Sequence, residues 1–220
     1  MSRLGPPDVS RFPLLTDDYV RTLHSGLLVG RIFFAGGDHP TSWNTFRTYG
    51  PTSSRFDHHP PPPKDHPVRG ILYAAPLVTD VDGEIVSPLD TALAEVFGPV
   101  GVVDTKLAEP HFVGFRLSRD VTSLDLVDSN WVTVAGATAS LFSGPRTGTR
   151  DWARAIYRHY TNPLDGLFYG SSNMPRGRSI AFFERARDAL SHADVLLPLS
   201  AAGLRADLEA ACSRLGFGLL

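Results

Sequence analysis

Short runs of apolar, β-favouring residues alternate along the chain with segments rich in Pro and Gly. Residues 27–34 (LLVGRIFF) and 70–75 (GILYAA) are predicted strands, because apolar runs of this length between turn signals are typical of buried strands. Further short strands are predicted at 100–103, 112–117, 167–169 and 180–183. These strands do not alternate regularly with helices, so the pattern favours an α+β fold over a doubly wound parallel sheet.

Capping residues predict a helix in the middle of the chain. Ser87 is a favourable N-cap and Pro88 suits the first helical position, so a helix should begin here and end before Gly98. Its apolar residues form one stripe that should face the core, and Glu95 falls off that stripe. The remaining elements that the pattern predicts are helices at 151–160 and 200–215 and a turn at 120–125.

Two units are expected along the chain. Residues 1–25 contain Pro6, Pro7 and Pro13 and are predicted to be a loosely structured lead-in. Residues 26–220, including the C-terminal helix, are predicted to form a single domain. The run Pro60–Pro63 should be an exposed polyproline II loop, because proline cannot serve in a helix interior or a central strand.

Composition excludes several classes of protein. The 220 residues are 42% hydrophobic and 20% charged, as in ordinary globular domains, and the formal net charge is −2. A near-neutral chain is not expected to bind nucleic acid directly. The chain begins without a signal-like apolar core and has no stretch apolar enough to span a bilayer, so it is expected to be cytoplasmic, with no membrane contact.

The usual short motifs of catalysis are absent. The sequence has no dinucleotide fingerprint, no phosphate-binding P-loop, no paired cysteines and no nucleophile elbow. His58, His59 and His66 are the only grouping that suggests a metal site. Adjacent side chains of an extended segment point to opposite sides, so this grouping is a poor chelate and no metal is expected.

Four separated pieces of sequence, in this order, resemble the RES domain family. They are SSRFD at 53–57, ILYAA at 71–75, TALAE at 91–95 and DGLFYGSS at 165–172, and GRIF at 30–33 resembles the family's opening strand. The resemblance covers roughly residues 27–190. Arg55 and Tyr73 are 18 positions apart and Tyr73 and Glu95 are 22 apart, which is wider than in the family. Insertions at Pro60–Pro63 and Asp80–Glu84 account for the difference.

The resemblance implies an ADP-ribosyltransferase-like fold, with a mixed, mainly antiparallel split sheet and flanking helices. It also implies an enzyme that consumes NAD by splitting the nicotinamide–ribose bond, either by hydrolysis or by phosphorolysis with phosphate as a co-substrate. NAD is then a substrate and no cofactor is required. Many members of the family are toxins paired with an Xre-type antitoxin, so such a partner protein is expected here. Self-association into a homo-oligomer is left open.

The same resemblance implies a set of site residues. Glu95, Arg55 and Ser171 are the expected catalytic residues, and Arg31, Tyr73 and Ser172 are the expected substrate-binding residues. A carboxylate can stabilise the positively charged sugar that remains when nicotinamide departs. A guanidinium suits a diphosphate, and an aromatic ring can stack on nicotinamide. No base adjoins Ser171 in the sequence, so a role in orientation is expected rather than covalent attack.

Each of these residues also has a purely structural interpretation. Glu95 could lie on a solvated helix face, Arg55 could pair with Asp57, and Tyr73 could be a core tyrosine. Ser171 could be an ordinary turn residue, and Ser172 is near enough in sequence to take its role. Two alternative functions also remain open, which are transfer of ADP-ribose to a macromolecule and NAD binding without catalysis.

Overall fold

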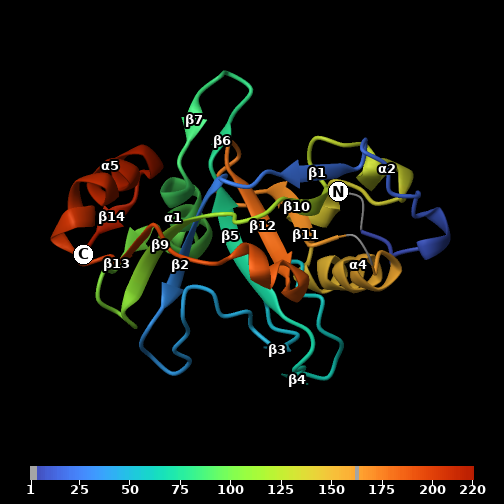
Figure 1. Cartoon of the computed structure of the whole chain (residues 1–220), viewed down its shortest axis with the longest axis horizontal. Helices are drawn as coiled ribbons and strands as arrows, with labels where there is room; N and C mark the ends of the chain where they lie inside the picture. Colours follow the sequence, from blue (N-terminus) through green and yellow to red (C-terminus); the bar gives the residue numbers. More distant parts are fainter. Residues whose placement is uncertain (1–3, 162–163) are drawn as a thin grey trace.

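A mainly antiparallel eight-stranded sheet forms the centre of the computed structural model, which describes residues 4–161 and 164–220 (Figure 1). Within this sheet, β10 and β11 are the one neighbouring pair of described strands that run parallel. In spatial order the strands are β1 (Val20–Leu23), β10 (Val121–Asp125), β11 (Gly166–Gly170), β12 (Arg178–Phe183), β5 (Ile71–Pro76), β2 (Leu28–Phe34), β9 (Pro110–Arg116) and β13 (Val195–Pro198). The predicted α+β class with a mainly antiparallel sheet is therefore confirmed.

The sheet is split between β5 and β2. Only two residue pairs join these strands, Val29 with Pro76 and Gly30 with Ala75, whereas β2 and β9 pair along seven residues. Three two-stranded ribbons lie outside the sheet, and they pair β3 (Tyr49–Gly50) with β4 (Lys64–Asp65), β6 (Val78–Thr79) with β7 (Ile85–Val86), and β8 (Val102–Val103) with β14 (Gly218–Leu219).

Two groups of helices pack on the sheet and lie at opposite ends of it (Figure 1). The first group is α1 (Pro88–Phe97) and α5 (Arg205–Leu215), and the second is α2 (Trp131–Val134), α3 (Ser140–Ser143) and α4 (Arg146–His159). Short 3-10 helices form at η1 (Val9–Arg11), η2 (Glu184–Ala189) and η3 (Ala202–Leu204). No described helix is long and apolar enough to cross a membrane.

Strand register shows that both helical groups cover the same face. Residues that pair across antiparallel strands share a face, and Gly30 pairs with Ala75, two positions from Tyr73. A Cβ at Gly30 would lie 2.7 Å from the Cβ of Pro88 in α1, which identifies the face that α1 covers. Tyr73 pairs with Ala181, which packs in the core beneath α2–α4. Tyr73 therefore lies on this shared face, on the strand next to the split.

Most predicted elements are confirmed, and three predictions need correction. The 120–125 segment is not a turn, because Val121–Asp125 is the inner strand β10. The lead-in is not wholly irregular, since Val20–Leu23 forms an edge strand paired with β10. The fourth helix begins at Arg146, five residues before the predicted start. The Pro60–Pro63 run is a largely exposed loop, as expected, and the Asp80–Glu84 turn is the tip of the β6–β7 hairpin.

Candidate functional site

Glu95 in α1 meets the loop that follows β11. Its Oε1 accepts a hydrogen bond from Ser171 Oγ at 2.5 Å and another from the backbone N–H of Ser172 at 2.8 Å. Glu95 and Ser171 are both half-buried, whereas Ser172 is exposed. The structure thus brings three predicted residues together, and it gives them different roles: Ser171 acts through its hydroxyl and Ser172 through its backbone.

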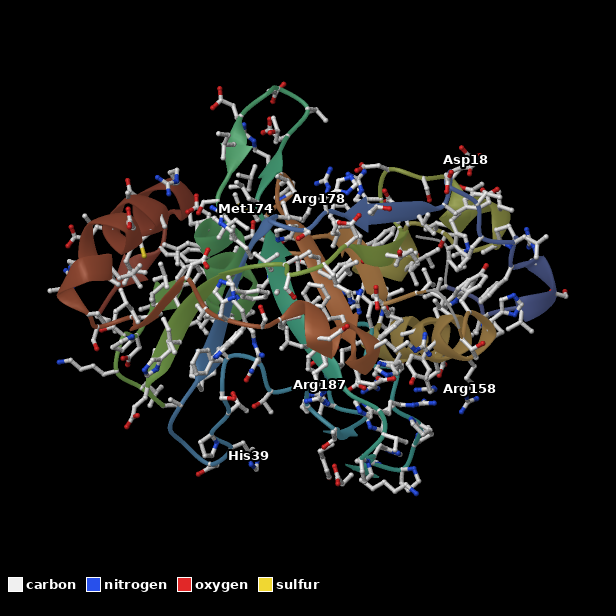
Figure 2. All side chains as sticks on the ribbon, viewed as in Figure 1. Asp18, His39, Arg158, Met174, Arg178 and Arg187 are labelled. Atoms are coloured by element: carbon white, nitrogen blue, oxygen red, sulfur yellow. The ribbon has the colours of Figure 1, made fainter. Side chains whose placement is uncertain are left out.

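The loop holding Ser171 is shaped by its own turn. Ser171 Oγ accepts hydrogen bonds from the N–H groups of Asn173 (3.3 Å) and Met174 (3.1 Å), which fixes the hydroxyl while it donates to Glu95. A Cβ at Gly177 would lie 2.7 Å from Thr91 Oγ1 of α1, so glycine lets the loop pack closely on the helix that carries Glu95. Met174 lies near α1 and the β6–β7 hairpin in Figure 2.

Arg55 lies on a loop anchored to the other helical group. Its guanidinium donates to Thr149 Oγ1 (3.3 Å) and to the carbonyl of Gly144 (3.3 Å), which hold it against the start of α4. Burial and the neighbouring Arg146 lower the pKa of Arg55, although the nearby Glu95 opposes this shift. No direct ion pair joins Arg55 to Glu95 among the residues that the structure describes. The charges of Arg55 and Glu95 therefore interact electrostatically without a direct contact, and Arg55 has no carboxylate partner among the described residues.

The hydroxyl of Tyr73 makes a hydrogen bond within the protein. Its hydroxyl donates to the backbone carbonyl of Arg55 at 2.8 Å, and burial raises its pKa above the ordinary range of a tyrosine. The hydroxyl thus fixes the Arg55 loop. The expected use of this hydroxyl to hold a polar group of the substrate would require that bond to break.

Tyr169 belongs to the same region and was missed as a site residue. It is 4% exposed, lies on the same face as Tyr73, and contacts the ring of Phe56 with centroids 4.6 Å apart. Burial and the nearby Glu95 raise its pKa well above the ordinary value. The signal was present in the sequence, because Tyr169 and Ser171 are two positions apart at the end of a strand, a spacing that puts side chains on one face.

Arg31 is not brought to this region. Its neighbours Gly30 and Ile32 face α1 and α5, so the side chain of Arg31 leaves β2 from the opposite face. There it donates to the carbonyl of Trp43 at 2.9 Å, and burial lowers its pKa to about 10. Arg31 thus holds the segment that follows β2 in place through this hydrogen bond. It does not contact Glu95, Ser171 or Ser172.

A buried polar cluster follows Arg55 and was also missed. Asp57 is fully buried and accepts hydrogen bonds from the backbone N–H and hydroxyl of Thr52, from the Arg47 guanidinium, and from the backbone and ring of His59. Burial alone would raise the pKa of Asp57, but these donors outweigh it and lower the pKa. Asp57 therefore pairs with Arg47 and not with Arg55.

The two adjacent histidines do not point to opposite sides as expected. The rings of His58 and His59 stack with centroids 5.1 Å apart, and both side chains are fully buried. No three His, Cys, Asp or Glu residues in the described part of the chain are arranged to hold a metal ion.

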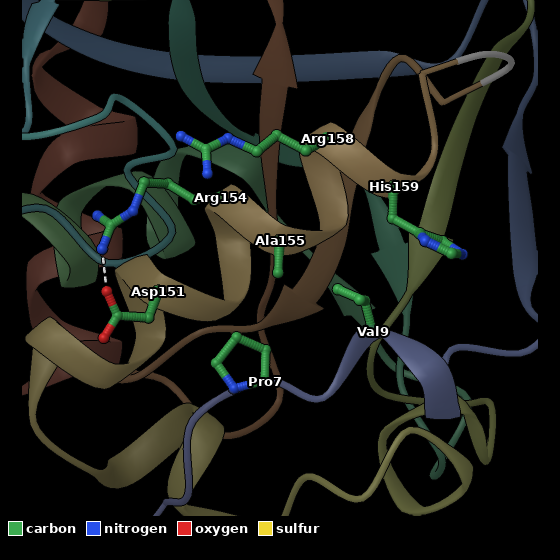
Figure 3. A pocket seen from close by; sticks show the side chains of 7 residues that line it. All are labelled: Pro7, Val9, Asp151, Arg154, Ala155, Arg158 and His159. Atoms are coloured by element: carbon green, nitrogen blue, oxygen red, sulfur yellow. Dashed lines mark hydrogen bonds and ion pairs between the residues drawn. The ribbon is translucent and has the colours of Figure 1, made fainter.

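Two cavities are lined by residues from other parts of the structure. Each has a volume of about 370 Å³. One lies between the N-terminal segment and α4, where Arg154, Arg158 and His159 line it (Figure 3). The other lies among β9, α1 and α5. Neither is lined by Glu95, Arg55, Tyr73 or Ser171.

Comparison with known proteins agrees with the fold. No family model matches the sequence, and no curated protein does. A chain in the crystal structure of the M. tuberculosis MbcT–MbcA toxin–antitoxin complex is similar, with a TM-score of 0.54 and 13% sequence identity. The match covers 92% of this chain and 96% of that one. The chain therefore has the fold of a protein from a toxin–antitoxin complex, in agreement with the resemblance found in its sequence.

Proposed function

We propose that this protein is an enzyme that consumes NAD by cleaving the bond between nicotinamide and ribose. The observation that carries the proposal is the Glu95 carboxylate, held at Oε1 by Ser171 Oγ and Ser172 N–H beside the cationic Arg55 loop. Two donors on one oxygen fix the direction of the carboxylate before substrate binds.

The chemistry needs a negative charge beside the sugar. When nicotinamide leaves, the bonding electron pair goes with it and the ribose carbon becomes electron-deficient. A carboxylate close to this carbon stabilises the positive charge, as in glycoside hydrolysis. Water, which releases a proton to solvent as its oxygen bonds to the carbon, completes hydrolysis, whereas attack by a phosphate oxygen completes phosphorolysis. Arg55, with no carboxylate partner of its own, is suited to hold the diphosphate of the dinucleotide.

The biological role that fits this activity is that of a toxin held inactive by an antitoxin protein. The similarity to a chain from a toxin–antitoxin complex supports this role. Depletion of NAD would stop growth, and an Xre-type antitoxin is the expected partner. Since NAD is an intracellular metabolite, the proposal places the protein in the cytoplasm.

Nicotinamide release from NAD tests the proposal. Purified protein should release nicotinamide, and Glu95→Gln should reduce the rate by about 100-fold, a typical loss when a preorganised electrostatic contact is removed. The reaction is run with and without phosphate, because ribose-phosphate products identify a phosphorylase. No release above the Glu95→Gln background under either condition would refute the proposal. Tight calorimetric NAD binding without turnover would indicate a silent binding module instead.

A further inference from the structure

The helix α4 carries a row of arginines that the site does not use. Arg146, Arg150, Arg154 and Arg158, called the arginine row here, are spaced four residues apart along this 14-residue helix. Four residues rise about 6 Å along a helix, so the row is about 18 Å long. Like charges at this spacing destabilise a helix. The stability of α4 by itself therefore does not account for the row.

Few negative charges accompany the row. Asp151 is the only carboxylate in α4, and it pairs with Arg154. Arg146 and Arg150 donate instead to the backbone carbonyls of Ser53 and Thr52. The helix also has no acidic residue in its first turn, where its dipole favours negative charge. Among residues 4–161 and 164–220, no carboxylate within salt-bridge distance neutralises Arg146, Arg150 or Arg158.

The row leads away from the Arg55 loop toward solvent. At one end, Arg146 contacts Ser53 and lowers the pKa of Arg55 through its charge, second to burial. At the other end, Arg154 and Arg158 project from the same side of α4 (Figure 3), and Arg158 is exposed at the periphery of the molecule (Figure 2). The positive charge of the row thus begins beside the proposed diphosphate clamp and continues for about 18 Å along α4.

We propose that the arginine row binds an extended acidic segment of a partner protein. Alternate residues of an extended chain lie about 6.6 Å apart, close to the 6 Å spacing of the row. Successive row positions turn by about 40° around the helix, so a flexible extended segment can follow the row where a rigid helix would contact only part of it. Arg154 is occupied by Asp151, but the guanidinium groups of Arg146, Arg150 and Arg158 lack a carboxylate partner among the described residues, and each can hold a carboxylate through two parallel hydrogen bonds.

A single-stranded nucleic acid fits the same surface less well. Such ligands need exposed aromatic faces on which bases stack. Tyr157 is the half-buried aromatic residue of α4, but the guanidinium groups of Arg69 and Arg185 lie 4.3 and 4.4 Å from its ring centroid. Its ring also stacks on His58. Carboxylates therefore match the row better than nucleotides do.

Binding of fluorescein-labelled decaglutamate, measured by anisotropy at low and at physiological salt, tests the proposal. The peptide should bind, with an affinity that falls as salt rises. The double variant Arg146→Gln/Arg158→Gln, which alters the two exposed ends of the row, should raise Kd about 10-fold. The matched control Arg116→Gln/Arg205→Gln removes the same charge from β9 and α5 and should raise Kd less than about 2-fold. Circular dichroism checks that both variants fold.

Two results would overturn the proposal. Equal weakening by the two double variants, or no binding at all, would mean that the row is not a specific surface. Tighter binding of labelled decathymidylate than of decaglutamate, lost in the row variant, would assign the row to nucleic acid. These measurements do not involve NAD, so they stand if no nicotinamide is released.

Discussion

Ser171 and Ser172 are adjacent serines with different contacts. Ser171 connects Glu95 to the turn through its hydroxyl, whereas the hydroxyl of Ser172 has no hydrogen bond among the described residues and only its backbone N–H reaches Glu95. Sequence placed both near the substrate and did not separate them, because residues next to each other in a loop have no fixed orientation. The structure separates them by the atom that each presents to Glu95.

Substitution of these two serines should therefore give different results. Ser171→Ala removes a donor to the carboxylate and should lower kcat for nicotinamide release by about 10-fold or more. Ser172→Ala keeps the backbone donor and should leave kcat within about 2-fold. Steady-state kinetics on both variants checks this, with thermal melts to confirm folding. A larger loss for Ser172→Ala than for Ser171→Ala would contradict the assignment.

At the scale of elements, the loop from Thr52 to His59 owes its shape to buried polar groups. The Asp57 carboxylate accepts five hydrogen bonds. Phe56 is fully buried with a φ of 61°, an uncommon conformation for a residue with a side chain. The loop is thereby held in the form that presents Arg55 to the region around Glu95. The sequence around Arg55 does not indicate that buried hydrogen bonds to Asp57 hold this loop in place.

His58 makes this loop sensitive to pH. Neither ring nitrogen has a hydrogen bond to any residue that the structure describes, and the Glu184 Oε2 oxygen is 3.8 Å from Nε2. Burial lowers the pKa of His58 to about 4, and the charges of His59 and Arg69 act in the same direction while Glu184 opposes them. The unfolded chain, with an ordinary histidine pKa of about 6.5, binds more protons between these values. The free energy of unfolding therefore falls as pH falls through this window.

The expected loss from His58 between pH 7 and pH 5 is about 2 kcal/mol. Glu184 titrates lower: burial would raise its pKa, but His58, Tyr157 and Gly70 outweigh this and bring it to about 2. Urea unfolding at the two pH values should show the loss in the native protein, and His58→Phe, which keeps an aromatic ring against Tyr157, should abolish it. The control variant His24→Gln, which changes an exposed histidine, should still show the loss of stability between pH 7 and pH 5. If the His58→Phe variant lost as much free energy of unfolding between pH 7 and pH 5 as the native protein, this account would be refuted.

At the scale of the whole molecule, the C-terminal helix is tied to the helix that carries Glu95. Arg214 of α5 makes two hydrogen bonds to Asp90 of α1, at 2.7 and 2.8 Å, and the Asp90 side chain is only 6% exposed. α1 and α5 also share a hydrophobic cluster with Ile32 of the sheet. The C-terminal helix thus stabilises the position of the helix that carries Glu95.

Removing this connection should destabilise the protein as a whole. Arg214→Gln leaves the Asp90 carboxylate without its charged partner, which should lower the free energy of unfolding by about 1–3 kcal/mol. Arg205→Gln breaks an exposed pair with Glu209 and should cost less than about 1 kcal/mol. Urea denaturation of the two variants at pH 7 compares them directly. Equal losses would show that the Asp90 pair contributes no more than a surface pair.

Much of this organisation was predictable from local patterns. The helix after Ser87 was identified because its cap, its proline and its apolar stripe agree, and the structure shows Ser87 Oγ accepting from Leu89 N–H. β10 was taken for a turn because it contains Thr, Ser and Asp. The tertiary structure supplies a distant partner for its buried Asp125, which accepts a hydrogen bond from Arg21, 104 positions away. Long-range partners of this kind leave no local signal.

Local sequence was thus sufficient for the α+β class, the helix bearing Glu95 and the strand before Ser171, because propensity, capping and side-chain period act over a few residues. Tertiary structure decided which residues meet. It joined Glu95 to Ser171 across 76 positions, turned Arg31 to the opposite face of the sheet, and engaged the Tyr73 hydroxyl with Arg55. The physical reason is that strand register and the packing of helices on a shared face depend on contacts between distant segments, which no short pattern encodes.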